Sequence, residues 1–183
     1  MTVHILGING SLRRGSTADR ALSYFLPLLQ ERGARCETFE IGGLPALDGR
    51  EDDSYPPAVA AWRAAAGSSD GFVFTVPSFH GGMPGAFKNA LDFLRIDQVG
   101  GKPFALIGVA VGDAEPGVTD TSRVMRHIGG VAGVMDIVIS RSGQHWGPED
   151  APANEAITPA MRKVAEDLVA FCQLRADGRL PGA

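Results

Sequence analysis

The sequence has few cysteines and no cluster of metal-ligating residues. Its two cysteines, Cys36 and Cys172, lie far apart and outside any Cys-x-x-Cys pair, which excludes a disulfide framework. We expect two buried or incidental thiols. The four histidines show no metal-ligand spacing, so the sequence predicts no metal site.

Long hydrophobic runs and strong charge of one sign are also missing. No apolar run approaches the roughly 18 to 20 residues that a membrane-spanning helix needs. The chain passes from Met1 and Thr2 directly into a strand pattern, without a basic leader segment, so we expect a cytoplasmic protein that does not bind membranes. The net charge of −4 gives no broad basic field, which argues against nucleic acid as a main partner.

The 183 residues alternate between strand and helix patterns along their whole length. We predict strands over residues 3–8, 35–41, 71–76, 103–111 and 134–139, and helices over residues 17–32, 57–66, 84–94, 119–129 and 159–174. This alternation predicts an α/β fold, a doubly wound five-stranded parallel sheet with helices on both faces. We expect one domain over residues 1–176 and a disordered tail over 177–183.

Local signals refine two of these helices. Pro27 lies inside the first and predicts a kink or an early end. Thr158 and Pro159 predict an N-cap and a first helical residue for the last.

The loop over residues 9–17 follows the first strand and opens a helix. A helix N-terminus offers unpaired N–H groups and the positive end of a dipole, which favour an anion. Hydroxyl and guanidinium groups suited to a phosphate are supplied by Ser11, Ser16, Thr17, Arg13 and Arg14. The alternative is that Ser16 or Thr17 only caps the helix while the arginines are solvated.

Ligands of parallel sheets bind beyond the carboxyl ends of the strands, which selects three loops, 9–17, 77–85 and 112–117. The second follows a buried strand and contains three glycines and two prolines. Phe79 and His80 offer planar faces, and Gly81 lets backbone N–H groups approach a flat ligand. Taken singly, each of these residues favours a structural role, and only together with the phosphate loop on the neighbouring strand do they favour a ligand site.

Two runs together resemble the NAD(P)H-dependent FMN reductases, which have a flavodoxin-like fold. Residues 10–17, GSLRRGST, resemble the Gly-Ser-x-Arg-x-x-Ser loop of that family. Residues 77–92, PSFHGGMPGAFKNALD, resemble its second signature, Pro-x-Tyr-His-Gly-Ser-x-Pro-Gly-x-Leu-Lys-Asn-Ala-Leu-Asp. The resemblance covers about residues 1 to 112 well, and the remainder by element order only.

The resemblance implies FMN and either NADPH or NADH as cofactors. The phosphate of FMN would be bound by Ser11, Arg13, Ser16 and Thr17, with Ala18 beside them. The isoalloxazine would be lined by Pro77, Ser78, Phe79, His80 and Gly81, and Gly112 in the third loop would also contact the cofactor.

The chain departs from the family pattern in its loops. Phe79 replaces the usual Tyr, Gly82 replaces the usual Ser, and Ala18 stands where some relatives have Thr or Asn. Asp113 and Glu115 place negative charge in the third loop, either near the flavin or, as we favour, facing solvent. We expect FMN binding to survive because the backbone donors are retained.

The function implied is transfer of two electrons from NAD(P)H through FMN to a small acceptor such as free flavin, a quinone or an azo compound. Because the cofactor carries this chemistry, no catalytic side chain is expected. A non-catalytic FMN electron carrier of flavodoxin type is the main alternative. A nicotinamide-binding fold without flavin and a flavin-free sensing module are the others; the Gly-x-Gly-x-x-Gly fingerprint of the former is missing.

The resemblance also implies a homodimer or homotetramer. Candidates for the contact surface are the apolar side chains Met83, Phe87, Phe93 and Trp146.

Overall fold

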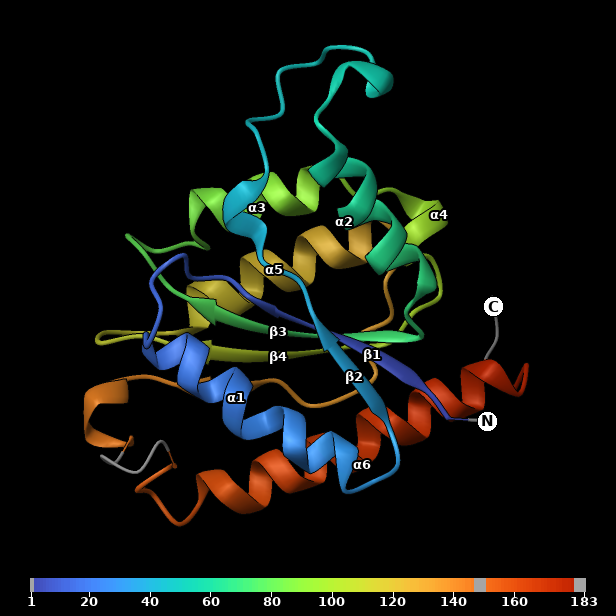
Figure 1. Cartoon of the computed structure of the whole chain (residues 1–183). Helices are drawn as coiled ribbons and strands as arrows, with labels where there is room; N and C mark the ends of the chain where they lie inside the picture. The colour runs from blue at the N-terminus through green and yellow to red at the C-terminus, as the bar shows by residue number, and fades with distance from the viewer. Residues whose placement is uncertain (1, 147–150, 180–183) are drawn as a thin grey trace.

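The protein is built on one sheet of five parallel strands (Figure 1). A computed structural model describes residues 2–146 and 151–179. The strands are β1 (His4–Asn9), β2 (Arg35–Thr38), β3 (Gly71–Pro77), β4 (Phe104–Val109) and β5 (Ile137–Ile139). Their order across the sheet is β2-β1-β3-β4-β5, and every neighbouring pair is parallel. This order is the flavodoxin-like one.

Helices cover both faces of the sheet, as Figure 1 shows. One face carries α1 (Thr17–Gln30) and α6 (Ile157–Ala176). The other carries α2 (Pro57–Ser68), α3 (Gly85–Asp92), the short α4 (Ile96–Val99) and α5 (Glu115–His127). The connections contain single 3₁₀ turns, η1 (Ile41–Gly43), η2 (Asp52–Ser54) and η3 (Ser142–Gln144). The predicted fold class is confirmed.

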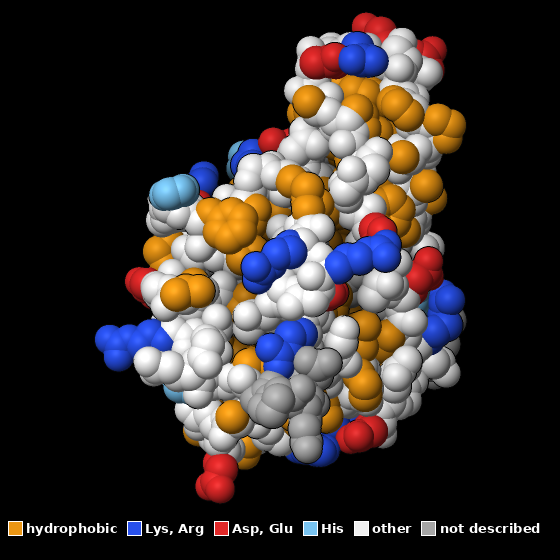
Figure 2. Space-filling model, turned by 60° about the vertical axis from the view of Figure 1, so that its left-hand side comes forward, with side chains coloured by type: hydrophobic (Ala, Val, Ile, Leu, Met, Phe, Trp, Pro, Cys, Tyr) orange, Lys and Arg blue, Asp and Glu red, His pale blue; other side chains and the backbone are white. Residues whose placement is uncertain are grey.

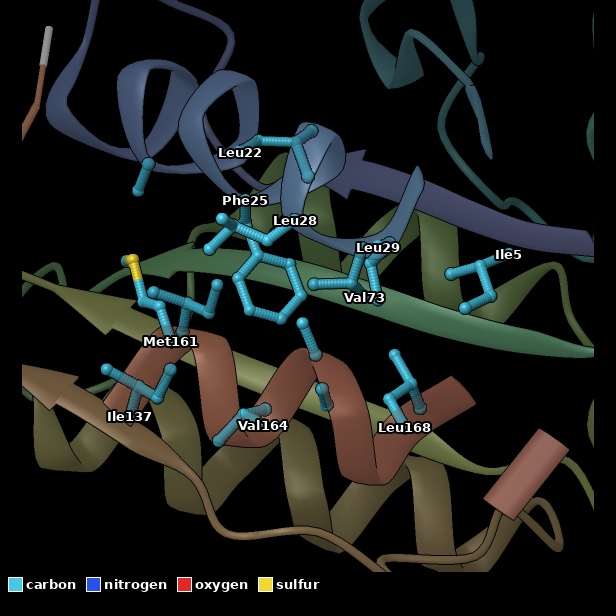
Figure 3. Packing of buried hydrophobic residues seen from close by; sticks show 14 of the residues in the cluster. Ile5, Leu22, Phe25, Leu28, Leu29, Val73, Ile137, Met161, Val164 and Leu168 are labelled. Carbon is cyan, nitrogen blue, oxygen red and sulfur yellow. The ribbon is translucent and has the colours of Figure 1, made fainter. Parts of the chain in front are cut away.

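The central strands β3 and β4 are buried along their whole length, as their continuous apolar runs predict. Side chains of β3 alternate between the two faces, so Val73 packs toward α1 and α6 while Phe72 and Phe74 pack toward α2 and α3. On the first face, Phe25 of α1 is fully buried between its own helix, the sheet and α6 (Figure 3). These contacts fix the position of α1, whose N-terminus borders the site described below.

The opposite face has an aromatic core. Phe74 of β3 lies 5.6 Å from the ring of Phe87 in α3, centroid to centroid. Trp62 of α2 is fully buried, and its Nε1 donates to the carbonyl oxygen of Ala90 at 2.8 Å. α2 and α3 are therefore joined by a hydrogen bond as well as by apolar packing.

Several predicted boundaries differ from those observed. The α1 helix continues through Pro27 to Gln30 without an early end. The α5 helix begins at Glu115, four residues before the predicted start. The predicted strands at 35–41, 103–111 and 134–139 are shorter in the structure, and α4 was not predicted.

The α6 helix also begins earlier than predicted, at Ile157, and its N-cap is Ala156. The side chain of Asn154 accepts a hydrogen bond from the backbone N–H of Ala156 at 2.9 Å, and its carbonyl accepts one from Ile157 at 3.1 Å. This turn starts the helix, so Thr158 lies within the first turn and is not the cap that the sequence predicts.

Three of the residues predicted to form an oligomer surface are instead core residues of this chain. Phe87 and Phe93 are fully buried, and Trp146 is nearly so. Only Met83 is half-buried, and it packs against the aromatic core. The prediction is wrong for the first three because their helical spacing and loop position serve intrachain packing.

The C-terminal segment and the two thiols complete the description. The predicted tail, 177–183, lies partly outside the described residues, which end at Arg179. The N–H of Arg179 donates to the carbonyl of Leu174 at 2.8 Å, closing the last turn of α6. Cys36 and Cys172 are free, half-buried and buried respectively. No helix in the described ranges has the length and apolarity needed to cross a bilayer.

Candidate functional site

The β1–α1 loop is tied to the neighbouring strand at its start. The N–H of Gly10 donates to the carbonyl oxygen of Thr75 in β3 at 2.8 Å. A Cβ at position 10 would lie 3.0 Å from that oxygen, so the close approach requires glycine. The N–H of Ser11 then donates to the side-chain oxygen of Asn9 at 2.9 Å. The loop is thereby fixed at the carboxyl ends of β1 and β3.

The N-terminus of α1 leaves two backbone donors free. Ser16 is the N-cap, and its hydroxyl accepts from the N–H of Asp19 at 3.2 Å. No described residue accepts a hydrogen bond from the N–H of Thr17 or Ala18. Both residues border the cavity described below, so these donors and the positive end of the helix dipole lie at its wall, where an anion would be favoured.

Asp19 stabilises this loop from its other side. Its carboxylate accepts from the N–H of Gly15 at 2.8 Å and from the side-chain amide of Asn9 at 3.4 Å. Gly15 has a φ of 67°, in the left-handed region that glycine tolerates. Asp19 does not line the cavity, so its negative charge is not directed toward a bound anion.

The β3–α3 loop folds into a tight hairpin turn. Phe79 and Gly82 exchange two backbone hydrogen bonds, of 2.9 and 3.2 Å. The two residues between them, His80 and Gly81, have φ values of 51° and 80°, as a type I′ turn requires. His80 and Gly81 form the exposed tip of the turn, whereas Phe79, 57% exposed, lies at its base beside the cavity.

Asp120 of α5 supports this turn. Its carboxylate accepts from the N–H of Met83 at 3.4 Å. A Cβ at Gly82 would lie 2.8 Å from the same carboxylate. The glycine that replaces the usual serine of the family pattern therefore leaves room for Asp120, which occupies the space that a serine side chain would need.

The third side of the cavity comes from the end of β4 and the loop before α5. Asp113, in this loop, accepts from the N–H of Glu115 at 3.1 Å and from the hydroxyl of Ser140 at 3.2 Å. The Ser140 hydroxyl in turn accepts from the N–H of Ala114 at 3.0 Å. Asp113 therefore binds the N–H of the first residue of α5 and does not line the cavity. Asp113 and Glu115 are both exposed, as expected if they face solvent.

Sequence reasoning missed one polar residue of the site, Ser142. The chain turns after β5 at Arg141, whose φ of 54° is left-handed. The N–H of Arg141 donates to Gly112 at 3.0 Å, and that of Ser142 donates to Ala110 at 2.8 Å. These bonds bring the buried Ser142 into the wall of the cavity. The left-handed backbone conformation of Arg141 has no sequence signature, so the position of Ser142 could not be predicted.

The three loops enclose a cavity of about 450 Å³, within the range typical of small-molecule sites. Figure 2 shows basic and apolar side chains side by side on part of the molecular surface. The cavity is lined by Ser11, Arg13, Ser16, Thr17, Ala18, Pro77, Ser78, Phe79, Val109, Ala110, Val111, Gly112 and Ser142. All the predicted cofactor contacts are in this lining except His80 and Gly81.

Comparison with known proteins identifies the family. The family model for NADPH-dependent FMN reductases matches residues 3–143, a range that includes all three sides of the cavity. The chain belongs to this family. Like its other members, this FMN reductase family protein is an oxidoreductase that uses FMN and NAD(P)H.

Individual relatives agree with this assignment. A 2-hydroxy-1,4-benzoquinone reductase of a Burkholderia species is 32% identical over 143 residues, covering 76% of this chain and 75% of that protein. An NAD(P)H-dependent FMN reductase of Pseudomonas aeruginosa is 33% identical over 117 residues, covering 60% of this chain and 61% of that protein. The flavoenzyme FerB of Paracoccus denitrificans, an NAD(P)H:(acceptor) oxidoreductase, has the same fold, with a TM-score of 0.83, 20% identity and coverage of 94% and 98%.

Proposed function

We propose that the 450 Å³ cavity binds FMN and that the protein uses it to pass electrons from NAD(P)H to a small acceptor. The observation that supports this most directly is that the cavity has two chemically different ends. One end offers hydrogen-bond donors and a positive charge. The other is apolar. A phosphate ester of a flat ring system matches both ends at once.

The phosphate end is formed by the first turn of α1 and the loop before it. The free N–H groups of Thr17 and Ala18 would donate to phosphate oxygens, with hydroxyls from Ser11 and Ser16 beside them. Arg13 would supply a charge-assisted bond. Ala18 needs no side-chain donor for this role, because its backbone N–H serves.

The ring end is formed by the second and third loops. Phe79 and Val111 are 57% and 89% exposed and both line the cavity, so a ring bound there would cover apolar surface. A Cβ at Gly112 would meet nothing within 4 Å, so the backbone there is open to a ring. The N–H groups of His80 and Gly81 have no described acceptor and are available at the turn. Pro77 and Ser78 complete the wall.

Among the described residues that line the cavity, Arg13 is the only ionisable side chain. The chain therefore places no general acid or base against the ring, and its contribution is to bind, orient and desolvate. The chemistry that FMN supplies when bound is acceptance of a hydride from NAD(P)H and delivery of two electrons to a second substrate. Protons for an acceptor would come from solvent at the open mouth of the cavity.

We further propose that the acceptor is a quinone or free flavin, on the strength of the relatives' activities.

A homodimer or homotetramer in the cytoplasm is also proposed. Free thiols fit a reducing compartment. Light scattering coupled to gel filtration would test the assembly, and a monomer at micromolar concentration would contradict it.

The function is tested by an anaerobic absorbance titration of the purified protein with FMN, followed by NADPH and, separately, NADH. We expect the flavin bands to shift on binding and to bleach within seconds of adding the nicotinamide nucleotide. Reoxidation by a benzoquinone would then identify the acceptor class. Protein that does not bind FMN would contradict the proposal.

The same experiment separates the enzyme from an electron carrier of flavodoxin type. A carrier would bind FMN but leave it oxidised in the presence of either nucleotide. Flavin that binds and does not bleach with NADPH or NADH would therefore favour the carrier.

A further inference from the structure

A second cavity, of about 270 Å³, lies on the other side of the β1–α1 loop. It is enclosed by this loop, by α1 and by the segment that leads from β2 into η1. Ser11 lines both cavities, so the two share a wall. The consecutive arginines of the loop are divided between them: Arg13 lines the first cavity and Arg14 lines the second.

Three charged side chains line the second cavity: Arg14, Asp19 and Glu40. The carboxylate of Asp19 is already engaged by the N–H of Gly15 and the side-chain amide of Asn9, so Arg14 and Glu40 are the charged pair left to meet a ligand. The guanidinium of Arg14 and the carboxylate of Glu40 are 3.6 Å apart, and their side chains are 90% and 85% exposed. So exposed a pair contributes little to the stability of the fold, and both groups can turn to a ligand at small cost. Hydroxyl groups of Ser23 and Thr38 stand in the same wall.

The floor of the cavity is apolar. It is formed by Leu22 and Leu26 of α1 and by Phe39 and Ile41 after β2. A cavity of this volume is too small for a whole dinucleotide and suits one nucleoside end of it. The combination of an apolar floor with a carboxylate and an arginine at the rim fits a purine base whose sugar and phosphate lie toward solvent.

We propose that this second cavity binds the adenosine end of NAD(P)H. Glu40 would accept hydrogen bonds from the ribose hydroxyls, and Arg14 would bind the 2′-phosphate of NADPH. In dinucleotide-binding sheets a carboxylate beyond the second strand binds this ribose, and a nearby arginine accommodates the 2′-phosphate. Glu40 follows β2 by two residues and faces Arg14 in the loop after β1, so a carboxylate and an arginine stand together here as well. The α1 N-terminus, which binds the pyrophosphate in those sheets, is assigned to the FMN phosphate in this protein, so the likeness is limited to the carboxylate and the arginine.

The proposal rests on the proposed function, and it assigns the choice between NADPH and NADH to one ion pair. When NADPH binds, its 2′-phosphate pairs with Arg14 in place of Glu40. The unpaired Glu40 carboxylate then repels that phosphate. A free ribose instead uses Glu40 and leaves Arg14 in solvent. The balance of these two side chains therefore sets the nucleotide preference, independently of the groups around the flavin.

The test is an amide chemical-shift titration of the FMN-saturated protein with adenosine 2′-monophosphate and adenosine 5′-monophosphate. Shifts are expected at Glu40 and Gly42, in the wall of the second cavity, and not at Gly112 in the first. The 2′ isomer should bind about tenfold more tightly, because its phosphate forms a charge-assisted bond with Arg14. Shifts confined to other residues, or none at millimolar nucleotide, would overturn the proposal.

Matched variants assign the effect to the pair. Arg14→Gln should abolish the difference between the two isomers, and Glu40→Gln should enlarge it. Arg35→Gln is the control, since Arg35 is also an exposed arginine near a glutamate but lies at the opposite end of β2. A loss of the isomer difference in Arg35→Gln as well would show that general charge, and not the second cavity, is responsible.

Steady-state kinetics separates this proposal from the proposed function. The ratio of kcat/KM for NADPH to that for NADH should fall about tenfold in Arg14→Gln and rise in Glu40→Gln, through KM and not kcat. If wild-type protein reduces FMN but the ratio does not move, the second cavity is not the adenosine site. If FMN is never reduced while the 2′ isomer still binds at Gly42, the proposed function fails and the nucleotide site stands.

Discussion

Arg13 and Arg14 are adjacent in the chain but line different cavities, so their substitution should have different effects. Substituting each arginine separately tests whether the two side chains bind different ligands. Their division between two cavities also explains why two arginines in a row need not be equivalent in a phosphate-binding loop.

Arg13→Gln should weaken FMN binding about tenfold or more, because a charge-assisted hydrogen bond contributes roughly 1.5 to 3 kcal/mol. Riboflavin, which has no phosphate, should bind the variant and the wild type equally. Quenching of flavin fluorescence measures both affinities. A parallel loss for riboflavin would mean that the variant disturbs the ring end or the fold and not the phosphate contact.

Gly82→Ser, which restores the residue usual in the family pattern, should destabilise this chain. The new side chain would displace the carboxylate of Asp120 and cost its bond to Met83, about 1 kcal/mol of unfolding free energy. Asp120→Ala should remove the penalty, so the double variant should be less destabilised than the sum of the single ones. Urea denaturation of the four proteins measures this coupling, and strict additivity would contradict the packing described.

At the level of elements, the end of α2 depends on a buried lysine from the segment before β4. The Lys102 ammonium donates to the carbonyl oxygens of Ala66 and Gly67 at 2.7 and 2.8 Å and lies 5.8 Å from the ring centre of Phe72. Burial lowers the pKa of Lys102 to about 8, and the nearby Arg175 acts in the same direction.

This lowered pKa predicts a pH dependence of stability. Between pH 8 and about 10.5 the unfolded chain holds a proton on Lys102 that the folded chain has released, so the unfolding free energy should rise with pH. In Lys102→Met this contribution should be absent. Denaturant unfolding at pH 7.5, 9 and 10.5 measures it, with Lys88→Met as an exposed-lysine control. A wild-type minus variant difference that is constant across this range would refute the assignment.

The elements also show what sequence can and cannot predict. The strands β3 and β4 are continuous apolar runs, so burial on both faces was predictable. The start of α5 was not, because it depends on hydrogen bonds from the N–H of Glu115 to Asp113 and from the distant Ser140 to Asp113.

The same limit applies to the candidate site. Residues of the first two loops were predictable from glycine, proline and hydroxyl patterns that act locally. Ser142 was not, since it enters the cavity wall through backbone bonds to Ala110 and a left-handed Arg141. The second cavity was missed for a similar reason: it forms where Arg14 and Glu40, well separated in sequence, face each other.

At the level of the whole molecule, the proposed FMN cavity is lined by residues from α1, β3, β4 and the segments that follow β1, β3, β4 and β5. A ligand that bridges these elements should stabilise the fold as one unit. With FMN at 100 times its dissociation constant, the gain is about 2.7 kcal/mol. For a chain of this size that corresponds to a rise in Tm of about 5 to 10 °C.

Differential scanning calorimetry measures this shift, with riboflavin as the control for the phosphate contribution. We expect one transition that moves as a whole, as a single domain over residues 1–176 would show. Two transitions, of which only one responds to FMN, would contradict the single-domain prediction.

The hairpin formed by residues 79–82 is closed by its own two hydrogen bonds, and its tip, His80 and Gly81, points into solvent. Substitutions at this tip that keep the left-handed backbone of both residues should therefore leave the sheet beneath undisturbed. Exchange of this short turn alone could change which electron acceptors the protein reduces. The turn is therefore a segment that natural variation and protein engineering can both replace without rebuilding the fold.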